Sequence, residues 1–308
     1  MFIEFHRNML ADKARNEAFY RALQQVIQAD RTSVADLGSG TGLLAFMAVK
    51  LGAKSVYLYE YSDALKLSQK LARHNRIGRC HFIHAHSAQV EHPHPVDVIV
   101  SETLGNYAYE ENIIENIEDA KRFLKPGGIV IPGHIEQFIA PVISERFYRE
   151  LCMWDEVGFA LDFAPAKAMS LNNFYVRTFA DSDLDSELPA QRWDAVDLSK
   201  HNKSVRKGRA EWKLPRELTV YGFALWWRCE LVPGVELTTS PFANLTHWEQ
   251  LYAPVREPIS GKAGDLLSID LHSDSRYEVG VNVKWTVGLH SVAGGATLEQ
   301  RLNMQDGS

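Results

Sequence analysis

The sequence Val34-Ala-Asp-Leu-Gly-Ser-Gly-Thr-Gly42 connects a short apolar run to a stretch of helical character. Residues 34–37 have the pattern of a buried strand, residues 43–51 have that of a helix, and the glycines between them predict a tight loop. Glycine lets the backbone turn sharply and approach a ligand closely. A strand, a glycine-rich loop and a helix in this order are typical of a nucleotide-binding unit on a parallel sheet.

The alternation of strands and helices continues on both sides of this loop. Residues 8–29 carry apolar side chains at helical spacing and predict one helix. Further strands are expected at 55–60, 80–84, 96–100 and 129–131, and helices at 63–75 and 111–124, with a turn at 125–128. Such alternation predicts an α/β, Rossmann-like domain with a doubly wound, mostly parallel sheet. We place an N-terminal helix at 1–30 and this domain at 31–135.

The pattern changes near Pro132 to Pro141. A helical stretch at 144–154 is followed by strand-rich sequence with many β-branched and aromatic residues. The clearest strand patterns are at 218–229, 266–271 and 277–287, and polar surface loops are expected at 181–189 and 200–209. We therefore predict a second domain at 136–308 that is an antiparallel β-barrel.

The composition limits the classes of function. The chain has 308 residues and a net charge of −6, and it has no dense basic run, which argues against a nucleic-acid partner. Three widely spaced cysteines form neither a disulfide framework nor a zinc-binding pattern, and the histidines between 81 and 94 lack metal-ligand spacing, so we expect no metal site. With no signal-peptide pattern and no long apolar segment, we expect a cytoplasmic protein without membrane contact.

The glycine loop favours S-adenosylmethionine over a nicotinamide dinucleotide. Asp36 lies at the end of the first strand, where a carboxylate would repel a pyrophosphate but attract an ammonium group. Glu60 ends the next strand and is placed to accept hydrogen bonds from both ribose hydroxyls. The segment 84–90 is the candidate for contact with adenine. The residues predicted to contact the cofactor in these segments are Asp36, Gly38, Ser39, Gly40, Gly42, Leu43, Glu60, Ser87 and Ala88.

Two carboxylates flank a turn that follows the strand at 96–100. Glu102 and Glu111 are nine residues apart, with Gly105-Asn106 at the turn between them, so both can face one point. A planar guanidinium offers the forked donors that match two carboxylates. By themselves, the two acids are better explained as a strand end and the start of a helix, where an acid suits the helix dipole.

These motifs together resemble the protein arginine methyltransferase family, and the chain is similar to a divergent, short member of bacterial type. The resemblance is carried by Met9-Leu-Ala-Asp-Lys-Ala-Arg15, the loop 36–42 with Glu60, the pair Glu102 and Glu111, the passage 123–132, and Thr246-His-Trp248. It implies a helix with Met9 and Arg15 that folds over the cofactor, a barrel, and a helical dimerisation arm at 151–170 that makes a homodimer.

The resemblance also implies the chemistry. Glu102 and Glu111 would clamp an arginine guanidinium beside the methyl donor, with Glu102 also near the cofactor, and Arg15 would pair with the cofactor's carboxylate. His247 would accept the proton, oriented by Asp12, or the two would tie the barrel to the N-terminal helix. We expect an arginine N-methyltransferase that acts on a protein or peptide. The alternatives are a methyltransferase for a small-molecule amine and a non-catalytic scaffold. Thr103-Leu104 leaves the type of product open.

Overall fold

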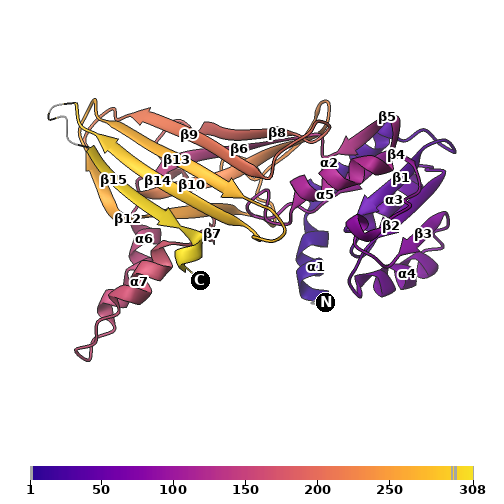
Figure 1. Ribbon diagram of the computed structural model, residues 1–308, viewed down its shortest axis with the longest axis horizontal. Coiled ribbons are helices and arrows are strands. Elements are labelled where there is room, and N and C mark those ends of the chain that lie inside the picture. Colours follow the sequence, from indigo (N-terminus) through magenta and orange to yellow (C-terminus); the bar gives the residue numbers. More distant parts are fainter. Residues whose placement is uncertain (1–2, 293, 295–296, 308) are drawn as a thin grey trace.

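The computed structural model describes residues 3–292, 294 and 297–307 of the chain. Figure 1 shows an elongated molecule with a parallel sheet at one end and antiparallel sheets at the other. The N-terminal helix α1 lies between the two ends, and a helical arm projects from the antiparallel part. Among the described residues, no helix combines the length and apolar character that crossing a membrane requires.

The parallel sheet has the strand order β3-β2-β1-β4-β5. Its strands are β1 Ser33–Leu37, β2 Ser55–Tyr59, β3 Cys80–Ile83, β4 Val96–Ser101 and β5 Leu124–Ile131. Every residue of β1 is buried, as its apolar run predicts. Leu37 pairs with Tyr59 of β2 on one side and with Ser101 of β4 on the other. The order of the strands therefore reverses around β1, and ligands bind at the carboxyl ends of strands at such a point.

The helices and short turns of this part follow the predicted alternation. They are α3 Leu43–Lys50, α4 Ala64–His74, α5 Ile113–Ala120, and the 3-10 turns η1 Ser87–Gln89 and η2 Lys121–Phe123. Two boundaries differ from the prediction. The helix expected at 111–124 begins only at Ile113 and ends in the 3-10 turn η2, and the turn expected at 125–128 is part of β5.

The second part is built from two antiparallel sheets. One has the order β7-β12-β10-β6-β8 with β11 beside β10, and the other has the order β15-β14-β13-β9. The strands are β6 His134–Val142, β7 Tyr175–Arg177, β8 Gln191–Asp197, β9 Val205–Lys213, β10 Leu218–Val232, β11 Val235–Thr238, β12 Gln250–Gly261, β13 Leu266–Asp274, β14 Asn282–His290 and β15 Thr297–Asn303. β8 contacts β9 and β12 contacts β15, so the sheets close on one another. Much of the loop expected at 200–209 is strand β9.

The N-terminal region is two helices rather than the single helix predicted for 8–29. Helix α1 spans Ile3–Ala11 and α2 spans Lys13–Val26. Asp12 lies between them as the N-cap of α2, where its carboxylate accepts a hydrogen bond from the backbone N–H of Arg15 at 3.0 Å. This bond satisfies one of the free donors at the start of a helix. Helix α2 packs against α3 and against β10 and β11, so it joins the two parts.

The arm consists of α6 Arg146–Leu151, η3 Met153–Glu156 and α7 Ala164–Leu171, and Figure 1 shows it extending away from the barrel. The helix expected at 144–154 is therefore shorter than predicted. At the far end of the arm, Phe159 is 91% exposed and Leu161 is 63% exposed. The remaining short turns are η4 Asp181–Asp183 and η5 Met304–Gly307.

Candidate active site

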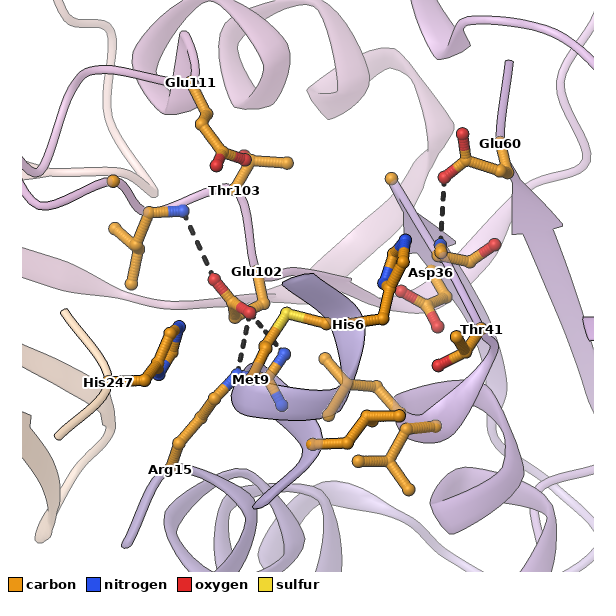
Figure 2. A pocket seen from close by; sticks show the side chains of 18 of the residues that line it. His6, Met9, Arg15, Asp36, Thr41, Glu60, Glu102, Thr103, Glu111 and His247 are labelled. Carbon is orange, nitrogen blue, oxygen red and sulfur yellow. Dashed lines mark hydrogen bonds and ion pairs between the residues drawn. The ribbon is translucent and has the colours of Figure 1, made fainter. Parts of the chain in front are cut away.

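A cavity of about 540 Å³ lies at the carboxyl ends of β1, β2 and β4. Helix α1 and the loop 246–248 of the barrel enclose it from the other side (Figure 2). The cavity brings together most residues that the sequence predicted for the site, from segments far apart in the chain. These are Met9, Arg15, Asp36, Gly38, Ser39, Gly40, Leu43, Glu60, Glu102, Glu111 and His247.

The glycine loop takes a shape that other residues would resist. Gly38, Gly40 and Gly42 have φ angles of +66°, +51° and +85°, in the left-handed region that favours glycine. A Cβ on Gly42 would lie 2.4 Å from the Oγ of Ser68 in helix α4. Gly42 does not line the cavity; it permits close packing of the loop on α4, and the loop can then present Gly38 and Gly40 to the cavity.

Glu60 is held in place by the backbone. Its carboxylate accepts hydrogen bonds from the backbone N–H of Gly40 at 2.9 Å and of Ser62 at 2.7 Å. Each carboxylate oxygen has a second lone pair that these bonds leave unused. The side chain is buried yet faces the cavity, so the acid is fixed where it can accept further hydrogen bonds from a bound ligand.

Asp36 is buried and faces the same cavity. Its carboxylate accepts a hydrogen bond from the backbone N–H of Ala45 in the first turn of α3, at 3.0 Å. Burial raises the pKa of Asp36 to about 7, although that hydrogen bond and the charge of Arg15 act to lower it. A cation bound beside Asp36 would stabilise the ionised carboxylate, because burial without a partner penalises the charge.

The charge of Glu102 is already paired with Arg15. Nε of Arg15 donates to Oε2 of Glu102 at 2.7 Å, and Nη2 donates to the same oxygen. The two side chains are only 4% and 6% exposed. A third donor, Nη1 of Arg15, bonds Oδ1 of Asn16 at 2.8 Å. The pair shows that a guanidinium fits against Glu102.

Glu111 faces the cavity without such a partner. Figure 2 places it beyond Thr103, with Glu102 between it and Arg15. Within the described residues its carboxylate makes no ion pair. Its side chain reaches solvent through the open cavity, but protein surrounds most of it, and this burial together with the charges of Glu102 and Glu110 raises the pKa of Glu111 to about 7. A guanidinium arriving here would meet a carboxyl group that it would help to ionise.

Asp12 and His247 connect the N-terminal helices to the barrel. Oδ2 of Asp12 lies 2.8 Å from Nδ1 of His247 and accepts a hydrogen bond from its backbone N–H at 3.0 Å. Burial acts to raise the pKa of Asp12, but the hydrogen bonds from Arg15 and His247 outweigh it and leave that pKa below its usual value. Asp12 does not line the cavity itself.

The loop that carries His247 is tied to the turn between the two glutamates. Nε1 of Trp248 donates to the carbonyl oxygen of Leu104 at 2.6 Å, and the side chain of Asn106 donates to the carbonyl oxygen of Trp248. Nε1 of Trp227 donates to the carbonyl oxygen of Gly105 at 3.1 Å. These bonds fix the turn against the barrel.

A second cavity, of about 480 Å³, lies on the other side of Glu111. Ser87 lines it together with Ala85, His86 and Gly38, whereas Ala88 lines neither cavity. Ser87 begins the 3-10 turn η1, in the segment after β3 that was predicted to contact adenine. The barrel contributes Tyr277 to this cavity, which the sequence analysis did not identify.

Tyr277 belongs to the loop after β13, which forms hydrogen bonds with residues at the start of α5. Its hydroxyl donates to Oδ1 of Asn116 at 2.6 Å, and Nδ2 of Asn116 donates to the backbone carbonyl of Glu111 at 3.0 Å. Ser275 adds two bonds: its carbonyl oxygen accepts from Asn112 at 2.5 Å, and its hydroxyl donates to Glu115 at 2.7 Å. The barrel thus holds the backbone that carries Glu111.

Several other residues that line the first cavity were not predicted, among them His6 and Glu110. His6 of α1 lies beside the loop, with its Cε1 3.4 Å from where a Cβ on Gly40 would be, and it carries a buried Nδ1 without a hydrogen bond. The position of His6 one helical turn before Met9 could have suggested it. Glu110 lines the cavity next to Glu111. No cluster of metal-ligating side chains occurs in the part of the chain that the structure describes.

Comparison with known proteins finds similarity to methyltransferases. A model of the family described as ribosomal protein L11 methyltransferase (PrmA) matches residues 19–150. The chain is 27% identical over 303 residues to a histone-arginine methyltransferase CARMER of Culex quinquefasciatus, covering 92% of this chain and 50% of the relative. It is 28% identical over 282 residues to a histone-arginine methyltransferase CARMER of Drosophila ananassae, covering 87% of this chain and 53% of the relative. The chain spans about half the length of these relatives.

Two solved structures share the whole fold. A chain of the Trypanosoma brucei PRMT1 enzyme-prozyme heterotetrameric complex with AdoHcy superposes with a TM-score of 0.87 at 19% identity, covering 97% of this chain and 98% of that one. Arabidopsis thaliana protein arginine methyltransferase 10 superposes with a TM-score of 0.81 at 20% identity, covering 98% of each. The predicted resemblance to protein arginine methyltransferases and the predicted fold class, a Rossmann-like sheet followed by a β-barrel, are both confirmed.

Proposed function

We propose that this protein is an S-adenosylmethionine-dependent N-methyltransferase that methylates a guanidinium nitrogen of arginine in a protein or peptide. The observation that carries the proposal is that Glu102 and Glu111 share one cavity with Glu60 and the glycine loop. Glu60 could therefore bind the ribose of a cofactor while Glu102 and Glu111 hold a cation beside that same cofactor. The relatives named as arginine methyltransferases support the same reaction.

The residues present fit S-adenosylmethionine. Glu60 would accept hydrogen bonds from the ribose hydroxyls, and buried Asp36 would gain the cationic partner that its raised pKa indicates it lacks. Arg15 would bind the carboxylate of the cofactor, with Met9 and His6 covering it from α1. The adenine would occupy the cavity of Ser87 and Tyr277. When bound, this cofactor supplies an electrophilic methyl group.

The two glutamates would hold and orient the acceptor. Arginine stays protonated at neutral pH, so its nitrogen must be turned towards the methyl group and its cation stabilised while charge shifts onto it. Carboxylates fixed on each side do both, and alignment of reactants can lower a barrier by up to roughly 7–11 kcal/mol in ideal cases. Glu102 already contacts one guanidinium, that of Arg15, and ionised Glu111 would bind the acceptor's other edge.

His247 is the candidate for taking up the released proton, and Asp12 would hold its ring. Nδ1 of His247 faces Asp12, which leaves Nε2 for the proton. The same contact ties α2 to the barrel, so a structural role coexists with the catalytic one. We also propose that the chain divides into an N-terminal helical segment at 1–30, a cofactor domain at 31–135 and a barrel domain at 136–308.

The arm at 151–170 is proposed as the dimerisation element of a homodimer. Its tip exposes Phe159 and Leu161, apolar side chains that a partner subunit would cover. Sedimentation should find a dimer for the intact chain and a monomer for the double variant Phe159→Ser, Leu161→Ser. A matched control replaces Phe242, which is 65% exposed on the barrel, by Ser and should leave the dimer intact. A double variant that still sediments as a dimer would rule out this interface.

The reaction itself is tested by incubation with methyl-labelled S-adenosylmethionine and three acceptors: an arginine peptide, the same peptide with lysine in place of arginine, and free arginine. We expect label only in the arginine peptide, recovered as methylarginine after hydrolysis. Label in free arginine but not in the peptide would favour a small-molecule methyltransferase. Absence of transfer to any acceptor, with cofactor binding intact by calorimetry, would favour a non-catalytic scaffold.

A further inference from the structure

A third hollow, of about 300 Å³, adjoins the acceptor end of the active-site cavity. Asn106 and Glu110 line both spaces, so the two lie next to one another at the turn that separates the two glutamates. The other wall residues belong mainly to the barrel and are Tyr107, Phe174, Val176, Leu251, Val281, Val283 and Met304. The cofactor-binding loop contributes nothing to it.

Apart from Asn106 and Glu110, the side chains that line this hollow are mainly apolar, and the hollow is partly open to solvent. Val176 lies on β7, the edge strand of its sheet, and is 42% exposed. Val281 directly precedes β14, Val283 is its second residue, and Met304 comes from the turn after β15. Apolar side chains that face an open hollow lose contact with water when another apolar group enters. The hollow thus suits an apolar side chain rather than a charged one.

Glu110 stands at the junction of the two spaces. A Cβ on Gly105 would lie 2.5 Å from Oε2 of Glu110, so Gly105 is what allows this carboxylate to fold back over the turn. Within the described residues, Glu110 forms no ion pair. A third negative charge beside Glu102 and Glu111 would repel an acidic side chain next to the acceptor arginine.

We propose that this hollow is a subsite for an apolar side chain located one or two residues from the acceptor arginine, with Glu110 excluding acidic neighbours. The inference rests on the proposed function and names the class of substrate: an arginine in a peptide with an apolar and non-acidic flank. A substrate peptide that runs along the turn from the first cavity to this hollow passes Glu110 before it reaches the apolar walls. Free arginine would leave the hollow empty.

Competition between peptides tests the subsite on the unaltered protein. Two arginine peptides of equal charge differ only in having leucine or serine at the positions that flank the arginine. Burial of one leucine side chain should raise kcat/KM about tenfold over the serine peptide. Equal kcat/KM values for the two peptides would overturn the subsite while leaving arginine methylation standing. Failure to methylate either peptide would overturn the proposed function and the subsite with it.

The variant Val176→Asp places a charge in the hollow, and Val205→Asp is its matched control, because Val205 is 37% exposed on the edge strand β9 away from the hollow. Val176→Asp should abolish the preference for leucine over serine, measured as the ratio of the two kcat/KM values, whereas Val205→Asp should keep that ratio. A preference that survives Val176→Asp would overturn the assignment of the subsite to this hollow.

The role of Glu110 is tested with a third peptide that has glutamate in the flanking positions. The kcat/KM of the unaltered protein should be about tenfold lower, or more, for this peptide than for the serine peptide, since like charges close to one another disfavour binding. Glu110→Gln should narrow that difference. The assignment of Glu110 fails if the ratio of the two rates is the same in both proteins.

Discussion

The guanidinium of Arg15 rests against the carboxylate of Glu102, with Nε donating to Oε2 at 2.7 Å and both side chains almost fully buried. Arg15 comes from the second helix of the chain and Glu102 from the end of β4, so the pair joins the covering helices to the sheet. A cofactor carboxylate would share the donors of Arg15 with Glu102. Cofactor binding would then leave Glu102 freer to accept the guanidinium of the substrate.

Breaking this pair should be costly. Arg15→Ala would leave Glu102 buried without its cation, and we expect the free energy of unfolding to fall by about 3–5 kcal/mol. The double variant Arg15→Ala, Glu102→Ala should lose much less than the sum of the single variants, because neither charge remains buried alone. Urea denaturation of the four proteins measures this coupling. Additive losses would show that the two side chains do not depend on one another.

Methyl transfer should depend on the ionisation of Glu111. The pKa of Glu111 is about 7, because of burial and the charges of Glu102 and Glu110, and only the ionised form can clamp a cation. The kcat/KM for an arginine peptide should therefore rise as the pH increases through about 7. Glu110→Gln removes one of the charges that raise this pKa, so the rise should move to lower pH. An unshifted profile would show that another group controls it.

The stability of the cofactor-free protein should fall as the pH rises from about 4 to about 7. Asp36 and Glu111 ionise near pH 7 in the folded state but near 4 in the unfolded state, so the folded state holds more protons in this window. The melting temperature should follow the same trend. Glu111→Gln should flatten it, and an equally steep trend in this variant would remove Glu111 from the explanation.

The sequence could predict the parts of the site whose signal is local. Val34–Leu37 belongs to a fully buried strand, as its mainly apolar run followed by glycines predicted, and those glycines take left-handed conformations. Glu60 lies at the predicted strand end. The break at Asp12 was missed because both helices keep an apolar face, which makes the periodicity look continuous, although an Asp before a helix is a capping signal.

The parts that could not be predicted depend on contacts between distant segments. No local pattern connects Arg15 to Glu102 or Tyr277 to Asn116, since each pair forms only when the sheet and the barrel are in place. The strand β9 was predicted as a loop because its exposed face is basic, while its buried residues Ala210 and Trp212 lie beyond the basic stretch. Register across a barrel is set by packing, which one sequence does not display.

The bonds from the barrel to helix α5 give a further prediction. Tyr277→Phe keeps the ring that lines the second cavity but removes the hydroxyl that holds Asn116, and through it the backbone of Glu111. We expect kcat to fall about tenfold with little change in KM for the cofactor, whereas Tyr277→Ala should raise that KM as well. Tyr20→Phe, on the exposed face of α2, is the control. Unchanged kcat in Tyr277→Phe would show that the hydroxyl does not position Glu111.

A substitution at the contact between Asp12 and His247 distinguishes a catalytic role of this pair from a structural one. Asp12→Asn keeps the cap of α2 and one hydrogen bond to the barrel but removes the charge that would support a protonated imidazole. If His247 takes up the proton, kcat should fall on the order of a hundredfold with a change in the pH profile. If the contact is only structural, the melting temperature will fall while kcat at a permissive temperature stays within about twofold of the unaltered protein.

The central claim is that Glu102 and Glu111 together orient a guanidinium beside the methyl donor. The most direct measurement is single-turnover methyl transfer from labelled S-adenosylmethionine to an arginine peptide, for the unaltered protein and for Glu111→Gln, with cofactor affinity measured in parallel by calorimetry. The account predicts that Glu111→Gln binds the cofactor within about threefold of normal and transfers label at least a hundredfold more slowly. Transfer at an undiminished rate by Glu111→Gln would contradict it.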